Sequence, residues 1–407
     1  MKNERIPLPI GTKLTPQLTI QKILSQDGAT SITYMALRNE AYRVVIKEAF
    51  PFESRNSFTR DGKCIHVCKT GEPSEDISVE DELNLFNEKF RNECNVAHTL
   101  IEANENNTIY TFACEDITQD VLKTIDFQGT VAHYMAIGTV QGRTLSEIIE
   151  NGEISLKQAL LYTNKILQAL QYIHNEKEMI YFDIKCDNLW FPNQLSPEET
   201  FCIFIDYGSA KKVADIPTAS FISTTDGYSA KEIQKLKNYV AKNDKENAKK
   251  YKEFIGFHTD LYSVGAIVFR LITQEKFDNQ AWGEITRTES PSKKMRLIKE
   301  SVIDALYNKH PYLVDRVSQM LAKAMYFSTT KDELLKNRYS SCTAFMQEIK
   351  LLLAILEDKG IHPEVFAMQS EKQLEILLQN MGIHSNGRGA TSDALFIQDW
   401  LADVKEG

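Results

Sequence analysis

The sequence contains no apolar run long enough to cross a bilayer. Its longest apolar stretches, at 265–269 and 351–356, are much shorter than the roughly 20 residues that a membrane-spanning helix needs. Residues 1–7 also lack the apolar core of a secretory signal peptide. We therefore expect a cytoplasmic protein that makes no membrane contact.

Cysteine is scarce, with seven residues scattered over 407 positions, which is not a disulfide framework in a chain of this size. Cys64 and Cys68 flank His66 and could suggest a zinc site. No second Cys/His pair follows at zinc-finger spacing, so we interpret them as free thiols in a loop. The other cysteines are Cys94, Cys114, Cys186, Cys202 and Cys342.

The chain also lacks an excess of positive charge. A net charge of -9 and a pI near 5.5 argue against nucleic acid as the main ligand, and solubility explains the acidity. Its 43% hydrophobic and 25% charged residues are typical of a globular protein. The length allows two to three domains or one enzyme with two lobes.

Three short segments contain a distinctive polar set. They are Val44-Val45-Ile46-Lys47, Asp183-Ile184-Lys185-Cys186-Asp187-Asn188 and Asp206-Tyr207-Gly208. A magnesium-nucleotide site needs a cation on the phosphates, a carboxylate for the attacking hydroxyl and oxygen ligands for the metal. Each segment alone is weak evidence, because Asp-Tyr-Gly is usually a turn and an apolar run ending in Lys is usually a strand. Their order and spacing together predict a phosphoryl-transfer site.

Periodicity predicts a sheet-rich first part. Residues 19–47 alternate and favour a hairpin and a third strand, whereas 51–80 lack periodicity and are expected to form a long excursion. Residues 81–100 show helical spacing and include Glu93. Residues 108–140 return to strands.

The second part is predicted to be mainly helical. A long amphipathic helix is expected over 156–174, short strands and turns over 179–208, and further helices over 228–357. The chain therefore fits an α+β class with two lobes, and the crevice between such parts is a common ligand site.

These motifs resemble the eukaryotic-like protein kinase family, and within it the bacterial serine/threonine kinases, over about 19–357. Residues 44–51, followed by Thr59-Arg60-Asp61-Gly62, look like a bacterial subgroup that carries an R-D-G insert. The resemblance implies a bilobal protein-kinase-like fold, with an N-lobe over 1–140, a C-lobe over 141–357 and a C-terminal helical extension over 358–407.

The resemblance assigns roles to the polar set. Lys47 is similar to the lysine that contacts the α- and β-phosphates of ATP, and Glu93 to its ion-pair partner. Asp183 resembles the catalytic base, and Lys185 the lysine that stabilises the transferring phosphoryl group. Asn188 and Asp206 resemble the two ligands of Mg²⁺. The positions implied for ATP binding are Gln26, Gly28, Ser31, Thr33, Val45, Lys47, Gly138 and Val140, with Ile137 as gatekeeper.

Downstream residues resemble structural parts of the same family. Glu232 in Gly227-Tyr228-Ser229-Ala230-Lys231-Glu232 is expected to pair with Arg338. Asp260 is expected to tie the backbone of the catalytic loop, and Thr225 to bridge to Asp183 and Lys185.

The sequence departs from the family pattern at three places. The phosphate loop retains one glycine of three, Gly28, and adds Asp27, so ATP affinity could be low. Phe182 replaces the arginine of H-R-D and cannot pair with a phosphate, since it has no charge or donor. Val45 and Trp190 replace smaller residues expected around adenine.

Three functions are compatible with this pattern. The preferred one is an active serine/threonine kinase acting on a protein substrate; the alternatives are a pseudokinase scaffold and a kinase-like enzyme for a small molecule or non-protein polymer. Residues 233–252 are lysine-rich and form either a solvated charged helix or a docking ridge for an acidic partner. Two helices expected at 364–381 and 391–404 either brace the larger lobe or bind a regulatory partner or a second copy.

Overall fold

The protein is described here by a computed structural model. It describes residues 6–26, 31–50, 57–62, 64–68, 79–101, 111–124, 132–138, 141–152, 154–193, 195–218, 225–274 and 280–357. These residues divide into two compact units: the first combines those up to Gln141 with Phe204–Ser209, and the second contains the rest. The expected helices at 364–381 and 391–404, Gly28 and Val140 all lie outside the described residues.

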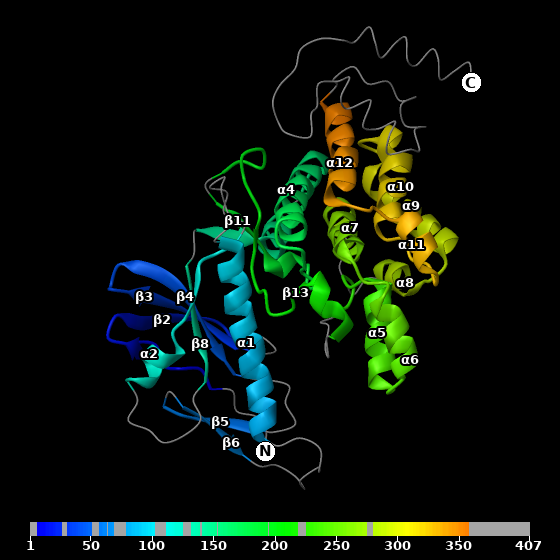
Figure 1. Cartoon of the computed structure of the whole chain (residues 1–407). Helices are drawn as coiled ribbons and strands as arrows, with labels where there is room; N and C mark the ends of the chain where they lie inside the picture. Colours follow the sequence, from blue (N-terminus) through cyan, green and yellow to red (C-terminus); the bar gives the residue numbers. More distant parts are fainter. Residues whose placement is uncertain are drawn as a thin grey trace, which may run out of the picture. The chain divides into compact units, whose positions relative to one another are not determined.

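The first unit is built on an antiparallel sheet. Among the described residues its strand order is β1-β2-β3-β4-β8-β7 (Figure 1). The strands are β1 (Lys13–Thr15), β2 (Leu18–Ser25), β3 (Ser31–Arg38), β4 (Tyr42–Ala49), β7 (Cys114–Asp116) and β8 (Tyr134–Gly138). The hairpin and third strand predicted over 19–47 are confirmed as β2, β3 and β4. Helix α1 (Val79–Ile101) contacts β4 and β7, and it confirms the helix predicted over 81–100.

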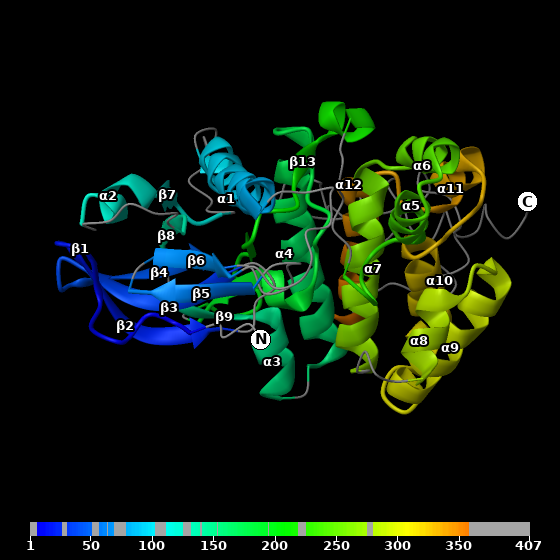
Figure 2. The same ribbon diagram turned by 90° about the horizontal axis from the view of Figure 1, so that it is seen from below.

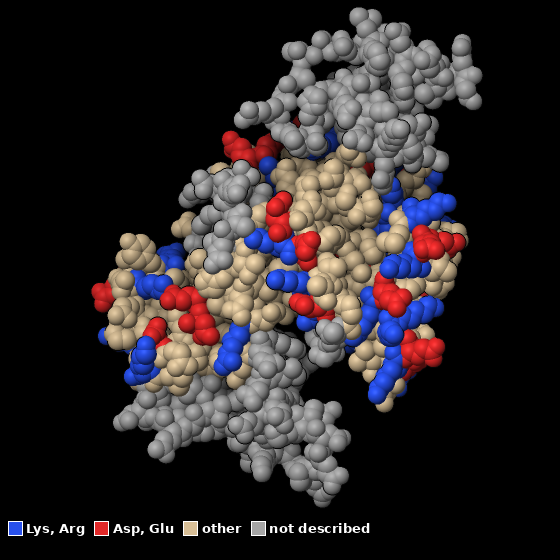
Figure 3. Space-filling view, viewed as in Figure 1, with Lys and Arg blue, Asp and Glu red and all other residues tan. Residues whose placement is uncertain are grey.

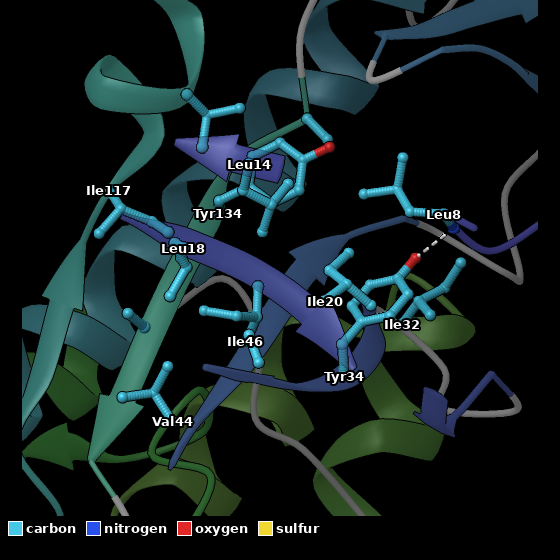
Figure 4. Close-up of a cluster of buried hydrophobic side chains, with 14 of the residues drawn as sticks. Leu8, Leu14, Leu18, Ile20, Ile32, Tyr34, Val44, Ile46, Ile117 and Tyr134 are labelled. Atoms are coloured by element: carbon cyan, nitrogen blue, oxygen red, sulfur yellow. Dashed lines mark hydrogen bonds between the residues drawn. The ribbon is translucent and has the colours of Figure 1, made fainter. Parts of the chain in front are cut away.

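Alternation along the strands separates a core face from a half-buried face. On β3, Ile32, Tyr34 and Ala36 are fully buried, whereas the residues between them are partly exposed. Figure 4 shows the core that these side chains form with Leu8 and neighbouring strands, including the hydrogen bond from the Leu8 amide to the Tyr34 hydroxyl at 2.9 Å. This core fixes which residues point to the opposite face of the sheet.

Two expectations for the first unit were wrong. The excursion at 51–80 contains a hairpin, β5 (Ser57–Asp61) and β6 (Cys64–Cys68), in place of structureless chain. Gly62 turns the chain at a φ of +56°, a conformation that glycine adopts without a Cβ clash. Cys64, His66 and Cys68 therefore lie in a strand instead of a loop. Helix α2 (Thr118–Leu122) interrupts 108–140, where the Asp116 carboxylate accepts the Thr118 amide at 2.9 Å.

The second unit is mainly helical, as predicted. Helix α4 (Leu156–Asn175) lies beside α7 (Phe257–Thr273) and α12 (Cys342–Leu356) in Figures 1 and 2, and both helices contact it. Ser155 begins α4 with a capping box, since its hydroxyl accepts the Gln158 amide at 3.2 Å and the Gln158 side chain returns to the Ser155 amide at 3.0 Å. Along α7 nearly every side chain is buried, which makes it the central helix of this unit.

The remaining elements of the second unit are short strands and peripheral helices. The strands are β9 (Gly142–Thr144), β10 (Met179–Ile180), β11 (Leu189–Pro192), β12 (Ile203–Phe204) and β13 (Lys211–Lys212). The helices are α3 (Leu145–Glu150), α5 (Lys231–Ala241), α6 (Lys245–Lys252), α8 (Gln280–Arg287), α9 (Pro291–Leu306), α10 (Val314–Ala324) and α11 (Lys331–Asn337), with 3-10 turns η1 (Cys186–Asn188), η2 (Val213–Thr218) and η3 (Pro311–Leu313). Short strands between 179 and 208 agree with the prediction.

The lysine-rich segment at 233–252 forms parts of two helices, not the single helix expected. Asn243 adopts a φ of +56°, and Asp244 caps α6 by accepting the Asn247 amide at 3.1 Å. Stacking of Tyr239 on Tyr251, at 5.4 Å between ring centroids, joins α5 to α6. Figure 3 shows Lys and Arg side chains gathered over these two helices.

In the part of the chain described, no single helix has both the length and the apolar composition needed to cross a bilayer; α6 and α7 meet that test only as a pair bent by 81°.

Candidate active site

The first group of predicted site residues lies in the first unit, around Lys47. β4 and α1 bring the Lys47 ammonium to 2.6 Å from the Glu93 carboxylate, so the expected ion pair is present. Asp206 lies 3.8 Å from the same ammonium. Lys47 therefore faces two carboxylates from segments that are 46 and 159 positions away in the chain, by subtraction of the residue numbers.

The electrostatics of this group depend on burial. Burial alone would lower the pKa of Lys47, but Asp206 and Glu93 raise it above its ordinary value. Burial raises the pKa of Glu93 to about 7, with Asp206 adding to the shift and Lys47 opposing it. Lys47 therefore stays charged across the physiological range, whereas Glu93 changes charge near neutral pH.

Several predicted ATP-binding residues share the half-buried face of the sheet with Lys47. Thr33 on β3 is paired with Lys47 on β4, and Val45 is paired with Ile137 on β8. Ser31 lies on the same face of β3, two residues before Thr33. This register gathers a cation, two hydroxyls and two apolar side chains on one face, which suits a nucleotide with its phosphates near the lysine.

Two other predicted ATP contacts lie at the edges of this face. Gln26 is exposed directly after β2. The Gly138 amide donates to the Ala113 carbonyl at 2.8 Å and so holds the end of β8 against β7. The predicted role of the Gly138 carbonyl toward adenine stays a prediction.

The Asp206-Tyr207-Gly208 turn presents its carboxylate. Asp206 adopts a φ of +69°, an uncommon conformation for a non-glycine residue that occurs at functional sites. Its side chain is 44% exposed, whereas Tyr207 is buried. A partly exposed carboxylate beside the Lys47 ammonium is a suitable hard ligand for Mg²⁺.

The second group of site residues lies in the second unit, around Asp183. Lys185 donates to one carboxylate oxygen of Asp183 at 2.8 Å, and the Asn188 amide donates to the same oxygen at 3.0 Å. The Thr225 hydroxyl donates to the other oxygen at 2.5 Å, as expected. Asn188 turns its nitrogen toward Asp183, which directs its amide oxygen, the atom a metal ion would bind, to the other side of the group.

A buried carboxylate fixes the backbone that carries Asp183. Asp260 on α7 accepts the Tyr181 amide at 2.8 Å and the Phe182 amide at 2.9 Å, which confirms the expected tie. His174, at the end of α4, contacts the same carboxylate at 2.9 Å. Phe182 adopts a φ of +67°, so these bonds hold a strained residue directly before the candidate base.

The expected pair between Glu232 and Arg338 is also present. Arg338 donates to both carboxylate oxygens of Glu232, at 2.6 and 3.2 Å, and also to the Tyr326 carbonyl. Burial alone would raise the pKa of Glu232, but Arg338 lowers it below its ordinary value. Both side chains are buried, so the pair anchors the first turn of α5.

Tyr228, four residues before Glu232, is held separately on α7. The Ser263 hydroxyl donates to the Tyr228 carbonyl at 2.9 Å, and Arg270 donates to its hydroxyl at 2.8 Å. The segment that resembles a peptide platform is therefore fixed at both ends in the second unit.

Sequence reasoning missed several residues of these networks. The helical spacing over 156–174 gives His174 only as the last residue of an amphipathic helix. Glu48, next to Lys47, is fully buried and accepts bonds from Tyr34 at 2.7 Å, Tyr134 at 2.6 Å and Arg60 at 2.6 Å. A charged residue at a core-facing position of a strand was the signal that could have revealed this network.

Residues 58–340, which make up well over half of the chain, match the protein kinase domain. Lys47 and the single-glycine loop precede the matched region. The structure adds the Lys47–Glu93 pair and the bonded Asp183 to this match.

Three curated relatives are similar over shorter segments. A candidate serine/threonine-protein kinase of Mycoplasma genitalium is 23% identical over 181 residues, 43% of this chain and 45% of the relative. The 3-phosphoinositide-dependent protein kinase 1 of Arabidopsis thaliana is 34% identical over 90 residues, 22% of this chain and 17% of the relative. The smooth-muscle myosin light chain kinase of Gallus gallus is 26% identical over 141 residues, 34% of this chain and 6% of the relative. The chain spans less than half the length of each of these relatives.

The protein kinase domain matches well over half of the chain, and the contacts described above hold the polar residues of the candidate site. The chain therefore belongs to the protein kinase family.

Proposed function

We propose that this protein is an active serine/threonine kinase that transfers the γ-phosphoryl group of ATP to a hydroxyl of a protein substrate in the cytoplasm. The observation that carries the proposal is the 2.6 Å pair between Lys47 and Glu93. Assembly of this pair is the usual criterion of a competent kinase site. A scaffold has no physical need to bury a glutamate beside a lysine.

The residues of the first unit would bind and orient the nucleotide. Lys47 would hold the α- and β-phosphates, and Glu93 fixes the direction of its ammonium. Asp206 offers an oxygen ligand for Mg²⁺, which would neutralise the charge that develops on the phosphates, and Asn188 of the second unit is the other proposed ligand. The hydroxyls of Ser31 and Thr33 share the Lys47 face.

The residues of the second unit would handle the proton and the transferred charge. The Asp183 carboxylate would orient the substrate hydroxyl and accept its proton. Lys185 and Thr225 hold both carboxylate oxygens in place, so the base is positioned before substrate arrives. Lys185 would also stabilise negative charge on the transferring group.

A pseudokinase scaffold is the second candidate. Phe182 favours it, because this residue is buried and offers no cation to a phosphorylated activation segment. The phosphate loop with a single glycine also favours weak nucleotide binding. The intact contacts of Lys47, Glu93 and Asp183 outweigh both features.

The proposal is tested by initial rates of phosphoryl transfer from γ-labelled ATP with Mg²⁺. Asp183→Asn should reduce the rate by about 1000-fold or more, because the base and its charge are lost. Asp187→Asn removes the same charge from an exposed position of the same loop and serves as the matched control. Equal rates for wild type and Asp183→Asn would contradict the assignment.

A further inference from the structure

A pair of buried thiols lies in the first unit, apart from the residues assigned above. Cys94 belongs to α1 and Cys114 to β7, and each is 4% exposed. Their sulfur atoms are 3.3 Å apart, and both cysteines are free. The two residues thus join a helix and a strand that the chain connects only through residues 95–113.

The thiols are linked to the Lys47 group by position. Cys94 directly follows Glu93 in α1. Cys114 is paired across β7 and β8 with Ile137, which is in turn paired with Val45, two residues before Lys47. A change in the distance between α1 and β7 therefore acts on the helix that presents Glu93.

The two thiols are joined by a hydrogen bond that affects their ionisation. The Cys114 thiol donates its hydrogen bond to the Cys94 sulfur, and this bond lowers the pKa of Cys94 below its ordinary value. The same bond and burial raise the pKa of Cys114, while the Lys47 ammonium opposes that shift. The hydrogen bond between the two thiols would stabilise a thiolate on Cys94, with Cys114 beside it to form the disulfide.

We propose that Cys94 and Cys114 are the site of a reversible intramolecular disulfide, formed by a peroxide, that fastens α1 to β7. The expectation for the rate of phosphoryl transfer rests on the proposed kinase function, whereas the proposal of the disulfide itself does not. The sulfurs need to approach from 3.3 Å to about 2.05 Å to form the bond.

The reaction balances with hydrogen peroxide as the two-electron oxidant. The Cys94 thiolate attacks one peroxide oxygen, the O–O bond breaks, and a sulfenic acid forms on Cys94 as hydroxide leaves. The Cys114 sulfur then attacks the Cys94 sulfur, the S–O bond breaks, and the second hydroxide leaves. With the two thiol protons these become two water molecules, and the cysteines are oxidised to one disulfide.

The disulfide would hold the arrangement in which Glu93 reaches Lys47. A covalent bond between α1 and β7 limits the movements that separate the helix from the sheet. The oxidised protein should therefore show slower amide hydrogen exchange in α1 and a higher melting temperature than the reduced protein. Its initial rate of phosphoryl transfer should be retained, since the pair is already formed at 2.6 Å in the reduced state.

The test uses the full chain, fully reduced and then treated with hydrogen peroxide while folded. Remaining thiols are blocked under denaturing conditions, and unreduced peptides are identified by mass spectrometry. We expect one linked pair of peptides, containing Cys94 and Cys114 and lighter by two hydrogens, that separates on reduction. Cys342→Ser, which changes a buried cysteine whose sulfur contacts His174 in the second unit, should keep the linkage.

Two results would overturn the proposal. One is recovery of Cys94 and Cys114 as unlinked residues after oxidation of the folded wild-type protein. The other is a linkage that forms only when the protein is unfolded before oxidation. Both are read from the mass of wild-type peptides, so neither depends on the folding of a variant or on kinase activity.

Discussion

Two buried ion pairs of this molecule differ in how strongly they hold the charge of their glutamate. Glu93 and Glu232 each accept a bond from a cation at 2.6 Å, one from Lys47 and the other from Arg338. The pKa of Glu93 is nevertheless raised to about 7, whereas that of Glu232 is lowered. The same type of pair therefore gives a charge that changes near neutral pH in one place and a permanent charge in the other.

The surroundings of the two glutamates explain this difference. Arg338 offers a planar fork that binds both oxygens of Glu232, and the Thr259 hydroxyl adds a donor at 3.3 Å. Glu93 has a backbone hydrogen bond from Tyr207 and the single ammonium of Lys47, which it shares with the negative Asp206 at 3.8 Å. A pair that shares its cation is adjustable, whereas a bidentate pair acts as a structural anchor.

Removal of Asp206 should produce the largest effect on the adjustable pair. Asp206→Asn is expected to reduce phosphoryl transfer by about 1000-fold or more, since the carboxylate proposed to bind Mg²⁺ is lost, with the fold retained. It should also lower the pKa of Glu93, because the negative charge of Asp206 raises it. Initial rates check the loss of transfer, thermal melting checks the fold, and melting as a function of pH checks the pKa of Glu93. Near-normal autophosphorylation by the variant would refute this role for Asp206.

Removal of Arg338 should break the anchor. Arg338→Met leaves the Glu232 carboxylate buried without its cation, at an expected cost of about 3–5 kcal/mol in the free energy of unfolding. The exposed pair of Arg38 with Glu115 provides the control, and Arg38→Met should cost less than about 1 kcal/mol. Denaturant unfolding measures both, and equal losses would show that Glu232 is not the anchor.

Neutralising Glu93 should affect rate more than stability. Glu93→Gln keeps the shape and a hydrogen bond to Lys47 but removes the charge that orients it. We expect phosphoryl transfer to fall by about 10- to 100-fold, with a melting temperature close to that of the wild type. A large loss of stability without a loss of rate per folded molecule would reverse the comparison with Arg338→Met.

The pH dependence gives a finer test of the same glutamate. Phosphoryl transfer should rise with pH through about 7 as Glu93 ionises, and Glu93→Gln should lack this rise. The contribution of Glu93 to stability should change in the opposite direction and fall as pH rises. Between the ordinary pKa of 4.5 and about 7, the folded protein holds more protons at Glu93 than the unfolded chain, so this group lowers the free energy of unfolding as pH rises. Identical pH–rate profiles for both proteins would exclude Glu93 as the group that titrates.

Dephosphorylation should leave the rate of phosphoryl transfer unchanged. Phe182 offers no cation to a phosphate on Ser220, Ser223 or Thr224, which lie outside the described residues. Complete dephosphorylation followed at once by initial rates on a fixed substrate should leave activity unchanged. A large loss that rephosphorylation of one of these residues restores would disprove the prediction.

The sequence was most informative where chemistry limits the choice of residue. Lys47, Asp183 and Asp206 could be proposed as site residues because phosphoryl transfer requires a cation and carboxylates in a fixed order. The strand and helix that carry Lys47 and Glu93 followed from simple alternation and helical spacing, which buried cores enforce.

The networks that hold these residues could not be predicted in the same way. His174 is the last residue of the predicted amphipathic helix. Only the fold brings it into contact with Asp260, which lies 86 positions later in the chain. Arg60 reaches Glu48 because a hairpin forms within an apparently irregular segment. The turn at Asn243 and Asp244 had a local signal, since Asp is a preferred N-cap, but the lysines around it suggested one continuous helix.

We propose above that this member of the protein kinase family is an enzyme. The most direct measurement is the identity of the labelled amino acids after incubation of the full chain and a protein substrate with γ-labelled ATP and Mg²⁺. We expect labelled phosphoserine or phosphothreonine with the wild type, and label at the background level with Asp183→Asn. A wild-type protein that melts cooperatively and binds ATP, but transfers no more label than Asp183→Asn, would contradict it and favour the scaffold.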